Sequence, residues 1–263
     1  MKKIKIDKIP FLLPKEIEKL TRGATVFDSS SSPEARVYFV RSDGGGLYLK
    51  RAERGSLKRE AEMDAYFYTL GLGPEVIDYV TDGEYDLLVT RAARGEDCTA
   101  AKYLERPERL CDRMGEILRA LHELDYTNCP AQDRLAEYLA TAEENYRLDQ
   151  FDKSHFPDSF GYHTSEEAYA VMQGGKHLLK PDVLIHGDFC LPNIMLEDWS
   201  FSAFIDLGCA GIADRHIDLF WGAWTLQFNL GTDNYRDRFF DAYGRDRIDE
   251  EKIKVIAAIE VFG

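Results

Sequence analysis

The chain has 263 residues, of which 44% are hydrophobic and 30% charged, and this composition allows a sizeable core and two lobes. Its formal net charge of −14 argues against nucleic acid and anionic membranes as partners, because both repel an acidic protein. The same charge would attract a cationic substrate, although acidity that only maintains solubility is the simpler explanation.

The first part of the chain, up to about residue 90, has the pattern of short β-strands bounded by Gly, Pro, Asp or Ser. Strands are expected at 25–29, 36–41, 47–50, 76–80 and 86–90. One helix, from about Gly55 to Leu70, interrupts them and ends at the strong stop signal Gly71-Leu-Gly-Pro74. These elements predict an N-terminal β-rich lobe over residues 1–91, with a five-stranded antiparallel sheet and one helix.

From residue 92 onward the pattern becomes mainly helical. Residues 92–97 are expected to form a short hinge that contains a glycine. Apolar residues at helical spacing predict helices at 107–124, 165–179 and 249–262. Short strands are expected at 183–185, 194–196 and 201–205. The C-terminal lobe should therefore span residues 98–263, and the fold class should be α+β with two lobes.

The cysteines argue against a disulfide framework and against a structural zinc site. They are odd in number, widely scattered and without a CxxC pair, at Cys98, Cys111, Cys129, Cys190 and Cys209. Asp7, Lys8 and Pro10 interrupt the segment that could otherwise begin a signal peptide, and no segment approaches the roughly 18 apolar residues of a transmembrane helix. We expect a soluble, cytoplasmic protein.

Two polar loops in the C-terminal lobe carry the chemistry. In His186-Gly-Asp-Phe-Cys-Leu-Pro-Asn193, Asp188 and Asn193 are five residues apart, a spacing that resembles the catalytic loop of protein kinases. Asp206-Leu-Gly208 follows a short strand, in the position of the metal-binding Asp-Phe-Gly of kinases. Carboxylate and amide oxygens are the ligands that Mg²⁺ prefers. Either triplet alone could be a polar turn that caps a buried strand, but together they predict phosphoryl transfer.

The N-terminal lobe offers a cation for the phosphates. Lys50 ends a predicted strand, where a kinase-type fold carries a lysine that contacts the α- and β-phosphates. On the following helix Glu60 lies in line with Met63 and Phe67, whereas Glu62 shares the polar face. An inward-facing carboxylate needs a cationic partner, so we predict a Lys50–Glu60 pair.

The phosphate-binding loop is less clear from the sequence. No Walker A motif is present, which argues against a P-loop kinase. The turn between the first two predicted strands lacks the glycines of a kinase loop, although backbone amides and hydroxyl groups around Ser32 could contact phosphate. A plain β-turn is an equally good interpretation.

The chain resembles the aminoglycoside phosphotransferase family, most closely its 3′-phosphotransferase (kanamycin kinase) branch. The resemblance runs along nearly the whole chain through Ser32-Pro33, Val37-Tyr38, Leu47-Tyr-Leu-Lys50, Arg59-Glu60, Leu121-His122, His186-Gly-Asp188, Asn193, Phe204-Ile-Asp-Leu-Gly208, Ala213-Asp214 and Asp218. It implies a protein-kinase-like two-lobe fold. It also implies that Asp188 orients or deprotonates the acceptor hydroxyl, and that Asn193 and Asp206 hold Mg²⁺. Lys50 and Glu60 would form the phosphate-binding pair.

The resemblance also implies contacts to the nucleotide base. Tyr48 would stack on one side of the base and Ile205 would pack on the other, while the backbone from Arg91 to Ala93 would hydrogen-bond its edge. From the residues alone, the side chains of Tyr48 and Ile205 would be ordinary strand core. Asp218 is expected to brace the catalytic loop rather than to contact substrate.

For the acceptor, the family resemblance implies a wall of carboxylates that binds ammonium groups. It places Asp158, Glu260 and Phe262 at substrate-binding positions, although solvated surface acids are an equally good interpretation of Asp158 and Glu260. The chain departs from the family pattern at Cys209, where a basic residue is usual. It also departs from it on the next helix, where aromatic and amide side chains replace charged ones at Trp221, Trp224, Gln227 and Phe228.

We therefore predict an enzyme that moves the γ-phosphoryl group of ATP or GTP, with Mg²⁺, to a hydroxyl of an aminoglycoside. Two alternatives stay open. One is a related kinase of another small amino alcohol or sugar, which would share the catalytic residues and differ near the substrate contacts. The other is a non-catalytic pseudokinase-type module. A small cationic substrate and a monomer or weak dimer are expected.

Overall fold

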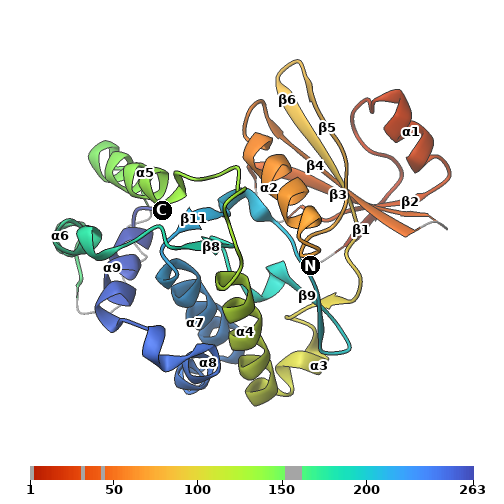
Figure 1. Cartoon of the computed structure of the whole chain (residues 1–263). Coiled ribbons are helices and arrows are strands. Elements are labelled where there is room, and N and C mark those ends of the chain that lie inside the picture. Colours follow the sequence, from red (N-terminus) through yellow and green to blue (C-terminus); the bar gives the residue numbers. More distant parts are fainter. Residues whose placement is uncertain (1–2, 31–32, 43–44, 152–161) are drawn as a thin grey trace. The chain divides into compact units, whose positions relative to one another are not determined.

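The computed structural model describes residues 3–30, 33–42, 45–151 and 162–263 (Figure 1). The chain forms two compact units, which are considered separately below. The first unit comprises Met1–Gly95 together with Met195–Gly208, and the second comprises Glu96–Ile194 together with Cys209–Gly263. Within the described residues, no helix is long and apolar enough to cross a membrane.

The first unit is built on an antiparallel sheet that has six strands among the described residues, in the order β1-β2-β3-β4-β6-β5. Its strands are β1 (Ile4–Ile6), β2 (Thr25–Asp28), β3 (Ala35–Ser42), β4 (Gly45–Glu53), β5 (Val76–Asp82) and β6 (Tyr85–Arg91). The expected number of five strands is wrong, because β1 also joins the sheet. This strand has only three residues, too few for a period-2 pattern, and it is held by pairing with β2.

Alternation along β4 decides what each face of the sheet carries. Leu47 and Leu49 lie in a core that also contains Ile17 of helix α1 (Lys15–Thr21). The next residues along the strand, Tyr48 and Lys50, point to the opposite face because successive side chains alternate. On that face, Ala52 packs with Ala61 of helix α2 (Lys58–Thr69). Lys50 and α2 therefore share one side of the sheet.

The segment 195–208 belongs to the first unit although it follows the sheet by about a hundred residues. It contains most of β9 (Ile194–Glu197) and all of β10 (Ser200–Phe204), which are neighbouring strands. Their two-residue connection has positive φ at Asp198 and Trp199, as tight hairpin turns require. Phe204 donates its backbone N–H to Leu72 O at 2.7 Å and makes an edge-to-face contact with Phe67 of α2. These contacts place the end of β10, and with it the residues that follow, beside α2.

The second unit is mainly helical. Its helices are α3 (Ala101–Leu104), α4 (Pro107–His122), α5 (Arg134–Leu148), α6 (Ser165–Gly175), α7 (His216–Leu230), α8 (Arg236–Tyr243) and α9 (Glu250–Glu260). Its strands are β7 (Glu96–Asp97), β8 (Val183–Ile185) and β11 (Gly211–Ala213), and β8 pairs antiparallel with β11. Short 3-10 turns lie at Lys176–Leu178, Leu191–Asn193 and Arg245–Arg247, and a fourth, Leu207–Cys209, lies at the boundary of the two units.

The periodic segments of the sequence predicted four of the helices correctly. α2, α4, α6 and α9 each begin and end within a few residues of their expected bounds. The helices α1, α3, α5 and α8 were not predicted. In α5 the reason is visible, since only Leu135, Tyr138 and Ala142 are buried, so the buried stripe of this helix is narrow. The predicted α+β fold class is confirmed.

Candidate active site

Lys50 is the centre of an ionic cluster in the first unit. Its Nζ lies 2.7 Å from Glu60 Oε2, 2.9 Å from Glu60 Oε1 and 2.7 Å from Asp206 Oδ1. Lys50 belongs to β4 and Glu60 to α2, and Asp206 is the second residue after the end of β10. Glu60 is buried and Glu62 is exposed, which confirms the assignment made from helical periodicity. The cluster therefore combines a shielded ion pair with a carboxylate that is half exposed.

The charges in this cluster shift the pKa of its members. Burial lowers the pKa of Lys50, but the charges of Asp206 and Glu60 outweigh it, so the net shift is upward and the lysine stays cationic. Burial raises the pKa of Glu60, and the positive charge of Lys50 opposes this shift. Asp64, one turn further along α2, has its pKa raised well above the usual range by burial and by the negative charge of Glu60. Sequence reasoning missed Asp64, because it treated only Glu60 and Glu62 as candidates.

Asp206 is held in an unusual backbone conformation. Its φ is +62°, in the left-handed region that non-glycine residues rarely adopt. Such a conformation costs on the order of 1–3 kcal/mol and persists only where the surroundings impose it. Gly208 follows two residues later, and a Cβ added there would lie 3.6 Å from Glu60 Oε2. The backbone thus directs the carboxylate of Asp206 toward Lys50.

The catalytic-loop candidates lie together in the second unit. Asn193 donates its side-chain amide to Asp188 Oδ2 at 2.8 Å and to the Asp188 carbonyl at 3.1 Å. The amide nitrogen therefore faces Asp188, which leaves the amide oxygen of Asn193 as its candidate metal ligand. Gly187 has a φ of +83°, and a Cβ added there would lie 2.0 Å from the carbonyl oxygen of Cys209. Only glycine fits at this position of the loop.

Asp218 of α7 fixes the start of this loop. Its Oδ2 accepts the backbone N–H of His186 at 2.8 Å, and its Oδ1 accepts that of Gly187 at 2.7 Å. The side chain is fully buried, and His122 Nε2 of α4 also contacts it at 3.1 Å. Two backbone amides and an imidazole thus satisfy the buried carboxylate. This geometry is what a bracing residue needs, and Asp218 makes none of its described contacts with the side chain of Asp188.

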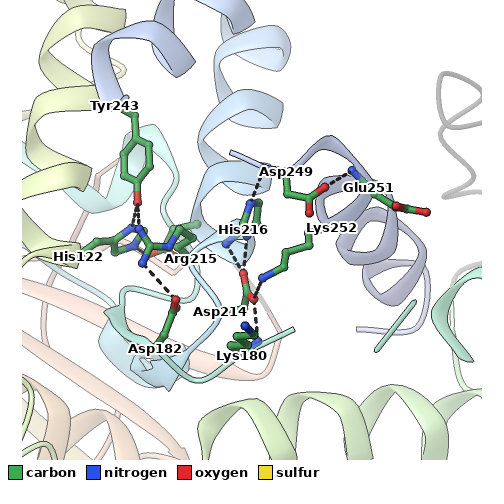
Figure 2. A network of polar contacts seen from close by, with 11 residues as sticks. His122, Lys180, Asp182, Asp214, Arg215, His216, Tyr243, Asp249, Glu251 and Lys252 are labelled. Atoms are coloured by element: carbon green, nitrogen blue, oxygen red, sulfur yellow. Dashed lines mark hydrogen bonds and ion pairs between the residues drawn. The ribbon is translucent and has the colours of Figure 1, made fainter. Parts of the chain in front are cut away.

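A chain of hydrogen bonds extends from His122 toward the surface (Figure 2). Because a carboxylate only accepts, His122 Nε2 donates to Asp218, and Nδ1 then accepts the hydroxyl hydrogen of Tyr243 at 2.9 Å. Arg215 donates to the oxygen of Tyr243 at 3.4 Å and to Asp182 at 3.2 Å. Tyr243 comes from α8, far away in sequence, so no spacing in the sequence could have indicated it.

A second part of the network in Figure 2 joins α9 to the segment between β11 and α7 and to the first residue of α7. Asp214 Oδ1 contacts His216 Nδ1 at 2.5 Å, and Asp214 Oδ2 accepts from Lys252 of α9 at 2.9 Å. His216 Nε2 accepts the backbone N–H of Asp249 at 2.9 Å, at the start of α9. Burial raises the pKa of Asp214, but its hydrogen bonds with His216 and Lys252 outweigh this, and the net shift is strongly downward. α9 is therefore anchored at its N-terminal end by a charged, buried group.

Glu260 lies at the other end of α9. Its Oε1 accepts the hydroxyl of Tyr138 at 2.7 Å and the indole N–H of Trp221 at 3.1 Å. Burial raises the pKa of Glu260 to about 7; the two hydrogen bonds oppose this, and the negative charge of Asp188 adds to it. Phe262 is fully buried, in edge-to-face contact with Tyr146. Of the predicted acceptor contacts, Glu260 is thus half-buried and Phe262 is part of an aromatic core.

The remaining predicted residues are the contacts to the nucleotide base, together with Ser32 and Asp158. Tyr48 and Ile205 are half-buried in the first unit, and Tyr48 has its ring centroid 5.0 Å from that of Phe39. The N–H of Arg91 already donates to Glu75 O, and the next residue donates to Gly46 O, whereas no described backbone bond uses the N–H of Ala93. Ser32 and Asp158 lie outside the described residues.

Each unit offers an oxygen donor of the kind that a hard divalent cation prefers. Within the described ranges, no group of three or more His, Cys, Asp or Glu side chains is placed to hold a metal by itself. The carboxylate of Asp206 and the amide oxygen of Asn193 are oxygen donors of the kind that Mg²⁺ prefers, and Mg²⁺ commonly takes its other ligands from water and phosphates. The residues are therefore compatible with a metal that arrives with a nucleotide.

An ionic Lys–Glu pair, an Asp–Asn loop and a second loop carboxylate define a kinase-like phosphotransferase. The chain belongs to the family described as "Phosphotransferase enzyme family", whose sequence model matches residues 30–255. It is 48% identical to the "Probable aminoglycoside 3'-phosphotransferase" of Lactococcus lactis subsp. lactis (strain IL1403), over 99% of this chain and 97% of that protein. It is also 28% identical to the "Aminoglycoside 3'-phosphotransferase" of Streptomyces fradiae, over 91% of each chain.

Solved structures support the fold assignment. The crystal structure of an aminoglycoside-3'-phosphotransferase of type VIII superimposes with a TM-score of 0.80, at 24% identity, over 95% of this chain and 97% of that one. At this identity the likeness establishes the fold alone. The predicted resemblance to the family and the predicted kinase-like fold class are both confirmed.

Proposed function

We propose that the enzyme transfers the γ-phosphoryl group of ATP or GTP to a hydroxyl of an aminoglycoside and thereby inactivates the antibiotic. The observation that carries the proposal is the loop in which Asn193 donates to Asp188 and Asp218 holds the two preceding backbone amides. Phosphoryl transfer requires a fixed carboxylate for the acceptor hydroxyl and an adjacent metal ligand, and this loop supplies both.

In the proposed reaction, Asp188 accepts the hydrogen of the acceptor hydroxyl and orients its oxygen. A bond forms between that oxygen and the γ-phosphorus, the bond from the γ-phosphorus to the β,γ-bridging oxygen breaks, and the nucleoside diphosphate leaves. Lys50, kept in place by Glu60, neutralises charge on the phosphates. Asn193 and Asp206 would hold Mg²⁺, which supplies further positive charge at the phosphate oxygens.

The nucleotide-binding residues belong to this proposal as well. Tyr48 and Ile205 would contact the base, with the N–H of Ala93 and the carbonyl of Arg91 at its edge. Ser32 would contact phosphate. Asp206 contacts Lys50 through Oδ1, and its carboxylate would also be a ligand for Mg²⁺ bound with the nucleotide.

An aminoglycoside is the acceptor that the charges favour. Aminoglycosides carry several ammonium groups, and the net charge of −14 together with the carboxylate of Glu260 attracts them. The relative from Lactococcus lactis, 48% identical along nearly the full chain, is named as a probable aminoglycoside 3'-phosphotransferase. Asp158 and Phe262 would complete the acceptor contacts.

A kinase of a different small amino alcohol or sugar is the second candidate. The observation in its favour is the exposed aromatic side chains Trp224 and Phe228, at positions where the family pattern has charged residues. Such a kinase would keep Asp188, Asn193 and Asp206 and would differ only in its acceptor. A panel of acceptors in an assay for nucleoside diphosphate release separates the two candidates.

Replacing Asp188 with Ala tests the proposal. The variant should lose turnover by about a hundredfold or more, because the acceptor hydroxyl loses its oriented base, while nucleotide affinity stays close to that of the wild type. Steady-state kinetics and nucleotide titration measure the two effects. Asp233→Ala, which alters an exposed aspartate, is the matched control and should retain full turnover. Undiminished turnover in Asp188→Ala would rule out the assignment.

We also propose that the enzyme acts in the cytoplasm as a monomer or weak dimer, without nucleic acid or membrane partners. All five cysteines are free thiols, as expected in a reducing compartment. Four of them are buried, and burial raises the pKa of Cys111, for example, to about 12, so it is not a reactive thiolate. Light scattering of the purified protein with and without acceptor measures the oligomeric state.

A further inference from the structure

Three aromatic side chains form a continuous row along α7. Trp221, Trp224 and Phe228 are spaced at i, i+3 and i+7, which places them on one side of the helix. The rings of Trp221 and Trp224 meet edge to face at 5.4 Å, and those of Trp224 and Phe228 stack at 5.1 Å with an interplanar angle of 11°. We call these three residues the aromatic ladder.

The outer part of the ladder faces solvent. Trp224 is 42% exposed and Phe228 is 70% exposed, whereas Trp221 is half-buried. Large aromatic surface left in water is unfavourable, and contiguous exposed patches of this kind commonly mark binding sites. The pre-stacked arrangement of Trp224 and Phe228 also presents a rigid surface, so that little conformational entropy is lost when a ligand covers it.

The inner end of the ladder adjoins the catalytic loop. Trp221 donates its indole N–H to Glu260 Oε1, and Glu260 lies close enough to Asp188 for the charge of that aspartate to affect its ionisation. Thr225, between the two outer rings in sequence, accepts the backbone N–H of Leu191 at 3.2 Å. Leu191 lies in the same loop as Asp188 and Asn193. A ligand on the ladder therefore lies beside the residues assigned to the acceptor, all within the second unit.

The combination of rings and carboxylate defines the chemistry of the ligand. The faces of aromatic rings carry partial negative charge and attract ammonium groups and polarised C–H bonds. Glu260 adds a carboxylate at one end, and the protein as a whole is acidic. A saturated ring with C–H groups on its flat side and ammonium substituents on its edge satisfies both features. An uncharged apolar partner would bring no further positive charge to Glu260 beyond that of Arg134.

We propose that the aromatic ladder is a subsite for the acceptor, in which a saturated, amino-substituted ring packs on the ring surfaces of Trp224 and Phe228 that these two side chains leave open, while an ammonium group of the acceptor is directed to Glu260. The inference rests on the proposed function and deepens it, because it names a ring-stacking mode of recognition at positions where the family pattern has charged residues. The subsite would select acceptors by ring shape in addition to charge.

Kinetics of ladder variants test the subsite. In Trp224→Ala and Phe228→Ala, the KM for kanamycin should rise about fivefold or more, the factor expected from the loss of a stacking or cation–π contact, while the KM for nucleotide and the kcat stay unchanged. Trp224→Phe keeps an aromatic face and should restore most of the affinity. Leu148→Ala, which truncates an exposed apolar side chain on α5, is the control and should behave as wild type.

Tryptophan fluorescence tests the same contact without turnover. The chain has three tryptophans, and Trp199→Phe leaves only those of the ladder. Titration of this variant with kanamycin should change its emission, and Trp224→Ala on this background should remove most of the change. If kanamycin is phosphorylated but neither its KM nor the emission responds to the ladder, the subsite is wrong and the proposed function stands.

The remaining outcomes are also distinct. An emission change without phosphorylation of any acceptor would support the subsite and contradict the proposed function. A second copy of the chain is the other occupant that an exposed aromatic surface could have. If the ladder variants convert a dimer to a monomer in light scattering and leave the KM for kanamycin unchanged, the ladder is a dimer interface and the proposal is overturned.

Discussion

At the scale of single residues, Glu260 is a group whose charge changes near neutral pH. Its pKa is raised to about 7 by burial and by the negative charge of Asp188, against the hydrogen bonds from Tyr138 and Trp221 and the positive charge of Arg134. The carboxyl group is therefore neutral below about pH 7 and negatively charged above it. Only the charged form attracts an ammonium group.

The first prediction concerns the pH dependence of acceptor binding. Affinity for kanamycin should increase as the pH rises from about 6 to about 8, because Glu260 loses its proton over this range. Near pH 7, binding should release protons, since the ammonium group stabilises the carboxylate. Calorimetric titrations in buffers of different ionisation enthalpy measure both effects. Glu260→Gln should remove the part of the pH dependence centred near 7, and an unchanged profile in this variant would contradict the assignment.

Single residues also show what the sequence could predict about the site. Helical periodicity identified Glu60 as the partner of Lys50, because a carboxylate on an apolar face needs a cation. It did not identify Asp64, whose burial depends on what α2 packs against. The partners of Glu260, Tyr138 and Trp221, lie 122 and 39 residues away, and no local pattern joins them.

At the scale of elements, helix α8 supports the catalytic loop, although the two are distant in the sequence. This helix packs against α4 and α7, which lie beside it in Figure 1. Through the packing it places the Tyr243 hydroxyl on His122, which contacts Asp218, which in turn holds the backbone amides of the loop. The helix therefore acts as a support for the loop as well as a part of the core.

The second prediction follows from this support. Tyr243→Phe removes one hydrogen bond to a buried imidazole, and kcat should fall by about three- to tenfold. The KM values for nucleotide and acceptor should stay unchanged, because Tyr243 acts on the loop through His122 and Asp218. A purely structural role would lower the melting temperature without this separation of kcat from KM. Tyr68→Phe, at an exposed position of α2, is the control.

The elements also show where prediction from the sequence succeeds. Strands and helices with strong periodicity were found within a few residues of their bounds, as for α4, whose apolar positions recur along one face of the helix. Elements stabilised mainly by tertiary packing were missed. The strand β1 is three residues long and depends on β2, and α8 has an apolar face made chiefly of Phe239, Phe240 and Tyr243.

At the scale of the whole molecule, the residues predicted to take part in the reaction are divided between the two compact units. The first unit holds Lys50, Glu60 and Asp206, although Asp206 follows Lys50 by 156 residues. The second unit holds Asp188, Asn193 and Glu260. The order of the motifs along the chain was sufficient to predict the phosphotransferase class. The composition of each unit was not predictable, because it depends on where β9 and β10 return to the N-terminal sheet region.

The measurement that tests the central claim most directly is mass spectrometry of an acceptor panel after incubation with the enzyme, Mg²⁺ and either ATP or GTP. The panel contains kanamycin, other aminoglycosides, and uncharged or singly charged amino alcohols. The account predicts that kanamycin or another aminoglycoside gains one phosphoryl group, and that Asp188→Ala abolishes the gain. Phosphorylation of a non-aminoglycoside alone, or of no acceptor in the panel, would contradict it.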